Sequence, residues 1–577
     1  MKKKLLPALI VTGLIILVVI IMGITALINK YTPTKKTEDL KEYFNISSDD
    51  EAALIVDNEL SDYKAKIIDK KIYVDYKFVH DSLNSRFYWD ANENVLLYTT
   101  ASDIISAAAD SNSYSVTKQT NDFGYPIVKA TSDSALIALD YVKQYSNITF
   151  KSYDDPARIV ITSKWDEIDS ATVSKSTQVR VKGGIKSPIL KEVKKDDKIT
   201  ILDSGNKWDK VATEDGVIGY IKSKALSESK KTKLTNPDYE EETFTHIKKD
   251  KDICLAWNQV TSKSANSKVP QVISSTKGIN VMSPTWFYLN DNNGNLADIA
   301  SKDYVSYCHS QGIEVWGLFS NFENTDVDAA YVLTHTSTRT TLINQIMSAA
   351  FNYELDGVNI DFENITEAAY GDSYIEFIRE LAIKCHNNGI SLSVDVTVPA
   401  SFNKFFNRSD MANFADYIVI MGYDEHYKGS DAGSVSSIPW VTEGVESTLK
   451  EVPADQIILG MPFYTRIWEL TPKEDDDAVT DTEDQSKYTV ASQVYSMDAA
   501  AAQLATNNAT AALDEESGQN YAEWSVSNKL YKVWLEDTTS LEKRLKLVDD
   551  NKLAGAAFWK LGFENSSVWD TVIKYLN

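Results

Sequence analysis

The stretch Leu355-Asp-Gly-Val-Asn-Ile-Asp-Phe-Glu-Asn364 contains the segment that decides both the fold and the candidate site. Side chains alternate between the two faces of a β-strand, so Asn359, Asp361 and Glu363 share one face and the apolar residues between them share the other. A row of polar groups is costly to bury without a purpose. The pattern therefore predicts a buried strand that ends in a catalytic site, in a calcium or magnesium site, or in a polar end exposed to water.

Seven further apolar runs of similar length surround this strand in residues 250–577, and amphipathic segments separate them. Continuous apolar strands that alternate with helices are typical of parallel sheets covered on both faces. Eight of them in one domain of this size favour a TIM (β/α)8 barrel over an open doubly wound sheet. The eight predicted strands are Ile253–Trp257, Ile279–Ser283, Glu314–Phe319, Gly357–Phe362, Ser391–Thr397, Tyr417–Met421, Ile457–Met461 and Gly555–Trp559.

Composition excludes several classes of protein. The chain has 577 residues with 59 basic and 83 acidic side chains, a net charge of −24 that would repel nucleic acid. A hydrophobic content of 43% excludes a mainly disordered chain, and three cysteines exclude a disulfide scaffold. Cys254, Cys308 and Cys385 lie in apolar segments and are expected to be buried thiols, and no Cys/His cluster suggests a metal site. We expect no cofactor and no nucleic-acid partner.

The N-terminus has the composition of a membrane anchor. Lys2, Lys3 and Lys4 precede residues 5–28, which carry no charge and would span about 36 Å as a helix. The lysines should stay in the cytoplasm, so residues 1–30 are predicted to be a short cytoplasmic stub and a signal-anchor, with the rest of the chain outside. A cleaved signal peptide is the alternative, but its apolar core is usually shorter.

Residues 31–50 are polar and predict a stalk, and a weak internal repeat follows in residues 51–166. The two copies, which begin near residues 72 and 136, both predict the order strand, short helix, strand, strand. The repeat resembles the small α+β module named after the copper amine oxidase N-terminal domain, although no His cluster suggests copper here. This resemblance implies an envelope protein.

Residues 167–228 contain short alternating strands, with a hairpin turn expected at Asp215-Gly216. The run from Lys207-Trp-Asp-Lys-Val to Gly219-Tyr-Ile resembles a bacterial SH3 domain, a small β-barrel. Its role is either binding of wall peptide or glycan, or that of a spacer. Residues 229–249 are predicted to be a linker to the catalytic domain at residues 250–577.

Four ordered motifs in residues 250–577 resemble family 18 glycoside hydrolases, the chitinase-like enzymes. Asp356-Gly-Val-Asn-Ile-Asp-Phe-Glu363 is similar to the family's Asp-x-x-Asp-x-Asp-x-Glu signature, and Met421-Gly-Tyr-Asp424 to its Met-x-Tyr-Asp element. Gly460-Met-Pro-Phe-Tyr464 and Ala556-Ala-Phe-Trp559 resemble elements of the last two strands. With Trp286, the pattern looks closest to the bacterial spore and cell-wall branch.

The resemblance implies a retaining mechanism in which the 2-acetamido group of the substrate is the nucleophile, an exception to the usual two-carboxylate scheme. Glu363 would be the acid and base, Asp361 would orient the acetamide, and Tyr423 would donate to the acetamide oxygen. The carboxylate of Asp361 is also expected to raise the pKa of Glu363. The residues expected to bind substrate are Asn359, Met421, Asp424, Trp559, Trp286 and Tyr464.

Asn359 departs from the signature, which usually has an aspartate there. An amide cannot share a proton with Asp361, so we expect Asp361 to ionise more readily than in enzymes with the aspartate. Asp356 lies outside the alternation and is interpreted as structural.

The sequence therefore predicts a membrane-anchored, extracytoplasmic glycosidase that cleaves β-1,4 bonds next to N-acetylglucosamine in peptidoglycan or chitin at the bacterial cell surface. The alternative is a glycan-binding, lectin-like envelope protein of the same fold. We take the protein to be a monomer. The sequence leaves open which polysaccharide is cut, and whether cleavage is endo or exo.

Overall fold

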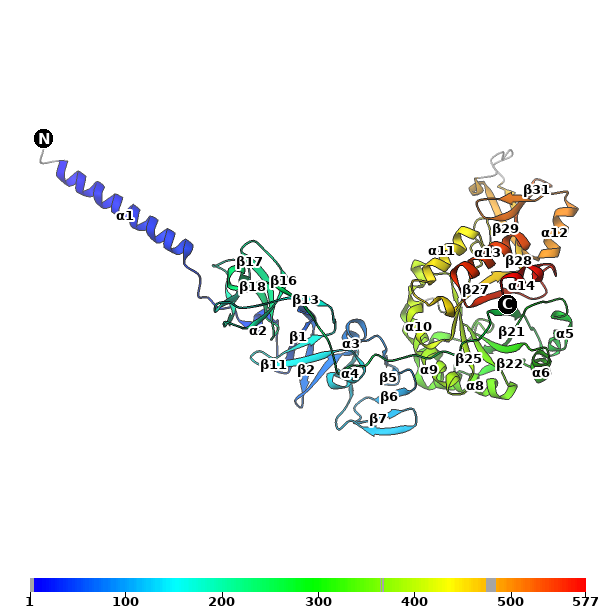
Figure 1. Ribbon diagram of the computed structural model, residues 1–577, viewed down its shortest axis with the longest axis horizontal. Helices are drawn as coiled ribbons and strands as arrows, with labels where there is room; N and C mark the ends of the chain where they lie inside the picture. Colours follow the sequence, from blue (N-terminus) through cyan, green and yellow to red (C-terminus); the bar gives the residue numbers. More distant parts are fainter. Residues whose placement is uncertain (1–4, 364, 366–367, 474–483, 577) are drawn as a thin grey trace. The chain divides into compact units, whose positions relative to one another are not determined.

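The computed structural model describes residues 5–363, 365, 368–473 and 484–576. The chain forms two compact units (Figure 1). The first contains residues 1–87, 107–114 and 122–241, and the second contains residues 88–106, 115–121 and 242–577. The predicted 51–166 module is therefore divided between the units, and its residues 88–106 belong with the C-terminal domain.

The second unit is built on a closed barrel of eight parallel strands, as predicted. The strands follow the order β20-β33-β27-β26-β25-β24-β23-β21, and pairing of β20 with β21 closes the ring. Their bounds are β20 Ile253–Asn258, β21 Val281–Leu289, β23 Glu314–Ser320, β24 Gly357–Asp361, β25 Ser391–Thr397, β26 Tyr417–Met421, β27 Ile457–Pro462 and β33 Gly555–Trp559. A short strand, β22 (Leu296–Asp298), pairs antiparallel with β21.

Helices cover the outside of the barrel (Figure 1). Residues such as Val358 and Ile360 of β24 point outward into the large core under these helices, whereas Trp257 and Leu318 fill the inside of the barrel. The helices are α5 Val269–Val272, α6 Lys302–Ser310, α7 Ala329–Thr334, α8 Thr336–Tyr353, α9 Gly371–His386, α10 Arg408–Phe414, α11 Ile438–Thr448, α13 Thr538–Asn551 and α14 Val568–Tyr575.

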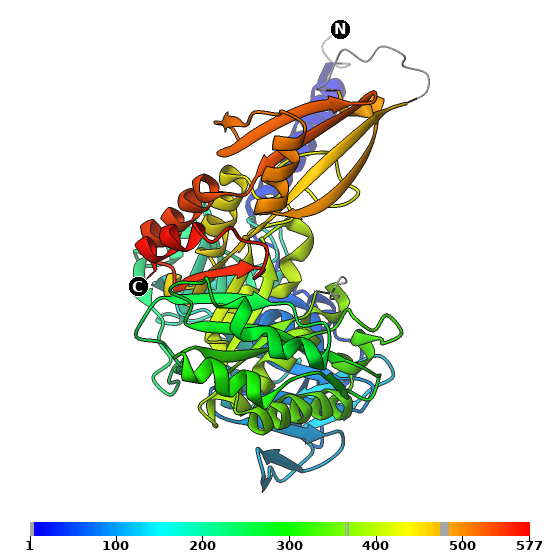
Figure 2. The same cartoon turned by 90° about the vertical axis from the view of Figure 1, so that its right-hand side faces the viewer.

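An antiparallel sheet is inserted between the last two barrel strands, shown in orange in Figure 2. Its strand order is β29-β28-β32-β31-β30, and α12 (Met497–Thr506) accompanies it. The strand bounds are β28 Tyr464–Pro472, β29 Tyr488–Ser496, β30 Ala512–Asp514, β31 Gln519–Val526 and β32 Lys529–Leu535. Aromatic residues form cross-strand pairs between β31 and β32, Tyr521 with Trp534 and Trp524 with Tyr531.

A hairpin from the N-terminal half of the chain packs on the barrel helices. It consists of β4 (Phe87–Asp90) and β5 (Val95–Thr99). Tyr88 hydrogen bonds through its hydroxyl to Ser373 of α9 over 2.9 Å, and Thr99 donates to the buried carboxylate of Glu376 over 2.8 Å. Asp90 accepts a hydrogen bond from the backbone amide at the start of α8. These contacts explain why residues 88–106 cluster with the barrel.

The first unit contains two seven-stranded sheets with the orders β11-β12-β1-β2-β3-β10-β9 and β15-β14-β18-β17-β16-β13-β19. Both predicted copies of the repeat have the expected order of strand, helix, strand, strand, beginning with β3 and with β10. The bounds are β1 Glu51–Val56, β2 Glu59–Ile68, β3 Lys71–Asp75, α3 Tyr76–Ser82, β9 Val128–Ala130, β10 Ala135–Ala138, α4 Leu139–Tyr145, β11 Thr149–Tyr153, β12 Arg158–Thr162, β13 Glu167–Thr172, β14 Thr177–Arg180, β15 Ile189–Val193, β16 Lys198–Asp203, β17 Trp208–Thr213, β18 Ile218–Lys222 and β19 Lys230–Lys233. The remaining strands, β6 Ile104–Ala108, β7 Ser113–Val116 and β8 Gln119–Asp122, extend the β4–β5 hairpin.

Parts of the predicted stalk and linker are folded instead. Within residues 31–50, the short helix α2 (Leu40–Tyr43) leads to Phe44, which is fully buried, and the Tyr43 hydroxyl donates to the carbonyl of Ile218. Within the linker, β19 pairs with β13. The buried ring of Phe44 secures the first segment, and backbone hydrogen bonds to β13 secure the second. The expected turn at Gly216 is present, whereas the SH3-like assignment stays a prediction.

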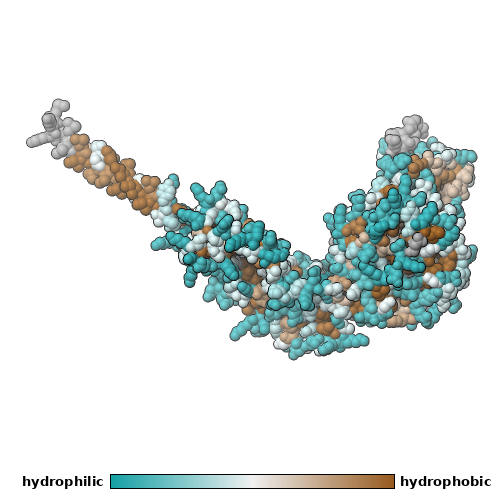
Figure 3. All heavy atoms as spheres, viewed as in Figure 1, coloured by the Kyte–Doolittle hydropathy of each residue, from teal (hydrophilic) through white to brown (hydrophobic). Residues whose placement is uncertain are grey.

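The helix α1 (Leu5–Tyr31) is long and apolar enough, from Pro7 to Tyr31, to cross a membrane. It is the mostly brown rod in Figure 3. A signal sequence near an N-terminus can meet the same criteria of length and composition, so the helix supports a membrane span or a signal sequence.

Candidate functional site

The strand β24 carries the centre of the site on its inner face, as the alternation predicted. Asn359 is 0% exposed and Asp361 is 6% exposed inside the barrel. Glu363 follows the end of the strand and its side chain is accessible to solvent. The carboxyl ends of the strands in this fold form the usual position of an active site.

Asn359 is held by four hydrogen bonds. Its side-chain oxygen accepts from the indole N–H of Trp257 and from the Ser283 hydroxyl, both over 2.9 Å. Its side-chain nitrogen donates to Ser393 over 3.1 Å and to the Oδ1 atom of Asp395 over 2.7 Å. Every donor and acceptor of the buried amide is therefore used within the protein, so Asn359 positions its neighbours and has no hydrogen-bonding group left for a substrate.

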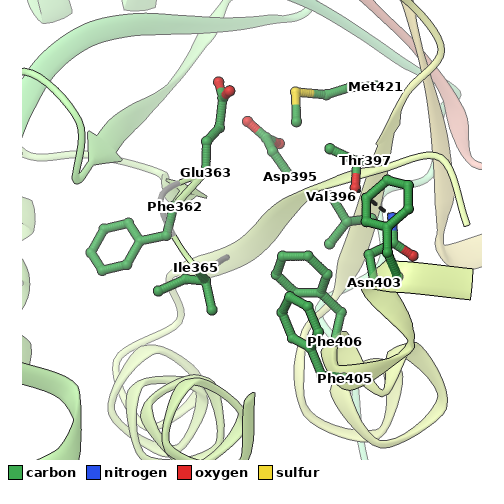
Figure 4. Close-up of a pocket in the computed structure, with 11 residues that line it drawn as sticks. Phe362, Glu363, Ile365, Asp395, Val396, Thr397, Asn403, Phe405, Phe406 and Met421 are labelled. Carbon is green, nitrogen blue, oxygen red and sulfur yellow. Dashed lines mark hydrogen bonds between the residues drawn. The ribbon is translucent and has the colours of Figure 1, made fainter. Parts of the chain in front are cut away.

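Asp395 is a second buried carboxylate that we did not predict, and it is 3% exposed. It lies on β25, where Ser391, Ser393 and Asp395 point inward and alternate with outward apolar residues. This period of two in the sequence was a signal that could have found it. Figure 4 shows the carboxylates of Asp395 and Glu363 near each other, close to Met421.

The expectation that Asp361 ionises more readily than in enzymes with an aspartate at position 359 stays a prediction, but its premise, one acidic neighbour fewer, does not hold in the structure. Burial raises the pKa of Asp361 well above its usual range, and the nearby carboxylates of Asp395, Glu363 and Glu323 raise it further. The asparagine at 359 removes one acidic neighbour from the same strand, but Asp395 on the adjacent strand supplies another. The pKa of Asp395 is also raised by its own burial, although the hydrogen bond from Asn359 opposes this shift.

The pKa of Glu363 is raised, as predicted, but mainly for a different reason. Desolvation by the surrounding walls is the largest cause, followed by the charges of Asp424 and Glu323. A carboxyl group that keeps its proton to higher pH is suited to act as a general acid.

Tyr423 and Tyr464 lie on the other side of the site. Burial raises the pKa of Tyr423 well above its usual value, so its hydroxyl keeps its proton and can donate a hydrogen bond. The ring of Tyr464 packs edge-on against that of Tyr423 with 6.2 Å between centroids, and its hydroxyl donates to Asp424. Asp424 therefore acts on the site partly by holding Tyr464.

A cavity of about 420 Å³ opens over these residues. Trp559 forms part of its wall, with its ring edge-on to Trp257 at 6.0 Å between centroids, and Met421 lies beside Tyr423. Five carboxylates line the cavity, and no lysine or arginine does so among the described residues. The five are Glu323, Asp361, Glu363, Asp395 and Asp424. The cavity thus combines aromatic walls with a lining rich in carboxyl groups.

A smaller apolar pocket of about 170 Å³ lies on the far side of Glu363 (Figure 4). Phe405 and Phe406 form its floor opposite Glu363 and Asp395. The nearby Phe402, in the 3-10 helix η4 (Ser401–Phe406) after β25, is 78% exposed. The two cavities share Glu363, Asp395 and Met421.

Trp286 does not lie in the site, contrary to the prediction. It is 0% exposed, its indole N–H donates to Asn266 over 2.8 Å, and its ring packs against Tyr304 of α6. Ser283 and Thr285 point inward on β21, so Trp286 points outward toward the helices. Asp356 has the structural role expected of it. It precedes β24, at the end of the strand away from the site, and its carboxylate accepts a hydrogen bond from the backbone amide of Val315.

Trp257 and Glu323 are further residues of the cavity that the sequence reasoning missed. Trp257 follows the inward alternation of β20, which could have indicated it. Glu323 lies in the loop after β23 and has no periodic signal; its carboxylate accepts from Ser320. Within the described part of the chain, no group of three or more His, Cys, Asp or Glu side chains is arranged to hold a metal ion.

Comparison with known proteins gives a consistent result. Residues 323–564 match the model of the glycosyl hydrolases family 18. The chain is 23% identical over 349 residues to the glycosylase YvbX of Bacillus subtilis, covering 56% of this chain and 95% of that protein. It is 24% identical to the cortical fragment-lytic enzyme of the same organism, covering 48% of this chain and 63% of the enzyme.

Among solved structures, the spore cortex-lytic enzyme SleL of Bacillus cereus superposes with a TM-score of 0.50 at 19% identity. The superposition covers 57% of this chain and 76% of that chain. This likeness supports the barrel fold.

Proposed function

We propose that this chain, a glycosidase with a family 18 domain, cleaves β-1,4 bonds next to N-acetylglucosamine in a cell-wall glycan. The observation that carries the proposal is the cavity, in which Glu363, Asp361 and Tyr423 converge beside the flat ring of Trp559. The names of the relatives favour peptidoglycan as the polysaccharide, and chitin is the second candidate.

The proposed reaction uses the acetamide of the substrate as the nucleophile. Glu363 gives its proton to the glycosidic oxygen, while the acetamide oxygen attacks the anomeric carbon and the leaving sugar departs. An oxazolinium-type intermediate results, with its N–H accepted by Asp361 and its oxygen held by Tyr423. Glu363, now ionised, then takes a proton from the water that opens the intermediate, so the anomeric configuration is retained.

The charges of the cavity support a neutral sugar at the cleaved position. Five carboxylates line the cavity, and no basic residue among the described ones lines it; Arg466, outside the lining, lies 3.8 Å from Asp424. An anionic substituent on that sugar would be repelled, whereas the positive charge that develops in the intermediate would be stabilised. N-Acetylglucosamine is neutral and N-acetylmuramic acid is anionic, so the bond cleaved is that of the glucosamine residue.

We assign the remaining parts to anchoring. The helix at Pro7–Tyr31 would hold the chain in the cell membrane with the barrel outside. The repeat and SH3-like modules of residues 51–228 would then either bind the wall or act as a spacer between the membrane and the glycan.

The second candidate is a lectin of the same fold. The accessible Glu363 with its raised pKa favours the enzyme, because a binding protein does not need a carboxyl group that keeps its proton.

The test is digestion of purified peptidoglycan and of chitin oligomers by the full chain in detergent. The Glu363→Gln variant removes the acid without changing its shape, and Glu446→Gln makes the same change on the exposed face of α11. We expect new reducing ends from the parent and from Glu446→Gln, and a loss of at least about 100-fold in Glu363→Gln. Glycan binding without release of reducing ends by the parent would establish the lectin.

A further inference from the structure

We propose that Asp361 and Asp395, neighbours on β24 and β25, form a pair that holds one proton, with Asp395 taking the role that the family signature gives to an aspartate at position 359. The kinetic part of this inference rests on the proposed function. The pairing itself rests on strand register, burial and hydrogen bonds.

The register places the two carboxylates side by side. Strands β24 and β25 pair in parallel through Asn359 with Ser393 and Ile360 with Val394, so the next pair is Asp361 with Asp395. Adjacent strands lie about 4.8 Å apart, whereas residues two apart on one strand are separated by about 6.6 Å. Asp395 is therefore nearer to Asp361 than an aspartate at position 359 would be.

The orientation of Asn359 decides which carboxylate is ionised. The indole N–H of Trp257 can only donate, so the atom of Asn359 that faces it is the oxygen. The nitrogen of Asn359 must then face Asp395, whose Oδ1 atom accepts its hydrogen bond. A donor stabilises the ionised form of a carboxyl group, so the negative charge belongs on Asp395.

Each carboxylate of the pair has one buried oxygen that no other described group satisfies. Asp361 Oδ1 and Asp395 Oδ2 are buried, and neither has a hydrogen-bond partner among the described residues. Two adjacent buried carboxylates cannot both be ionised at low cost. A proton carried by Asp361 and donated to Asp395 satisfies both oxygens at once.

The pair then has a defined role in the reaction. The second oxygen of Asp361 accepts the acetamide N–H while its proton is on the side of Asp395. As positive charge develops on the acetamide, the proton moves from Asp361 to Asp395, and the negative charge moves to Asp361 beside the substrate. Hydrolysis reverses the transfer, so no proton is consumed. Asp395 is a positioning residue in this scheme.

The pH dependence also involves the other titratable groups that face the pair. These are Glu363 after β24, Glu323 after β23, Tyr423 after β26 and Tyr374 on α9. We therefore test the pair by changing only its own members and Asn359.

The first test needs no substrate. Infrared spectra of the full chain at neutral pH, with isotope-labelled aspartate, are expected to contain the band of a protonated, buried aspartic acid. Asp361→Asn should abolish this band, and Asp395→Asn should shift its frequency, because the proton on Asp361 then loses its charged acceptor. An unchanged band in Asp395→Asn would overturn the inference, even if the parent cleaved no glycan.

The second test moves the carboxylate. Asp395→Asn is expected to lower kcat by about 100-fold with little change in KM, and to shift the acid limb of kcat/KM to lower pH. Asn359→Asp places a third carboxylate beside Asp395 and should also lose activity. The double variant Asn359→Asp/Asp395→Asn keeps the hydrogen bond between positions 359 and 395 with its direction reversed, and it restores a pair of carboxyl groups with Asp361. Its kcat should therefore be at least about tenfold higher than that of Asp395→Asn. If the double variant is folded, as judged by near-ultraviolet circular dichroism, and its kcat is no higher than that of Asp395→Asn, the proposed role of Asp395 is refuted. An Asp395→Asn variant with the pH profile of the parent would refute it as well.

Discussion

The hydroxyl of Thr99 offers a quantitative test of how the β4–β5 hairpin is held to the barrel. Thr99 and Glu376 are both 0% exposed, and the hydroxyl donates to the carboxylate over 2.8 Å. Glu376 is also paired with Arg379 over 2.9 Å on the same helix. Thr99→Val keeps the shape of the side chain and removes this one donor.

The expected cost follows from the charge and the burial. A hydrogen bond to a charged group contributes about 1.5–3 kcal/mol, and no water replaces the lost donor at a buried site. A value of about 2 kcal/mol corresponds to a roughly 30-fold increase in the open state of the hairpin. Thr99→Ser keeps the donor and loses one methyl group, so it should cost about 0.8 kcal/mol.

Hydrogen–deuterium exchange of the full chain in detergent measures this opening directly. Peptides from residues 88–99 should exchange about 30-fold faster in Thr99→Val and about fourfold faster in Thr99→Ser, while the β31–β32 hairpin keeps the parent's rates. An increase of less than threefold in the exchange rate of Thr99→Val, or an increase in Thr99→Ser larger than that in Thr99→Val, would refute the reasoning. The outcome also decides whether a catalytic fragment must include residues 88–106.

Three further predictions concern the site and the core. Asp424→Asn removes a negative charge that raises the pKa of Glu363, so the alkaline limb of the pH–rate profile should move to lower pH; a limb that stays in place or rises would contradict this assignment. Trp559→Phe should lower kcat/KM for glycan by about fivefold to tenfold with little loss of stability, whereas Trp286→Phe should cost about 2 kcal/mol in urea unfolding and leave KM unchanged. Arg544→Met should cost about 3–5 kcal/mol in the same assay, because it leaves the fully buried carboxylate of Glu536 without the two hydrogen bonds, of 2.7 and 2.9 Å, that the arginine donates. A cost under about 1 kcal/mol would show that the ion pair is not needed for stability.

The barrel itself was predictable because its information is local. Each strand is a short apolar run, and eight such runs separated by helices leave few arrangements that bury both faces. Alternation along a single strand was sufficient to place Asn359, Asp361 and Glu363 on one face. The same rule, applied to β20 and β25, would have found Trp257 and Asp395.

Other features depended on which segments meet. Trp286 was interpreted as a substrate contact by resemblance, but the alternation of β21 directs it into the outer core. The β4–β5 hairpin was assigned to an N-terminal module, and only its contacts with α8 and α9 place it in the barrel unit. The predicted stalk contains Phe44, whose burial requires a sheet formed by distant residues.

The pKa values of the site residues show most clearly what the sequence determines and what the tertiary structure determines. The sequence by itself determined that a row of polar groups ends a buried strand, and that position 359 lacks the usual carboxylate. The tertiary structure alone decided that a carboxylate returns from the next strand, since Asp361 and Asp395 are 34 positions apart in the chain but adjacent in the register. The physical reason is that a pKa responds to charges and water in space, and lateral neighbours in a sheet are set by the register rather than by distance along the chain.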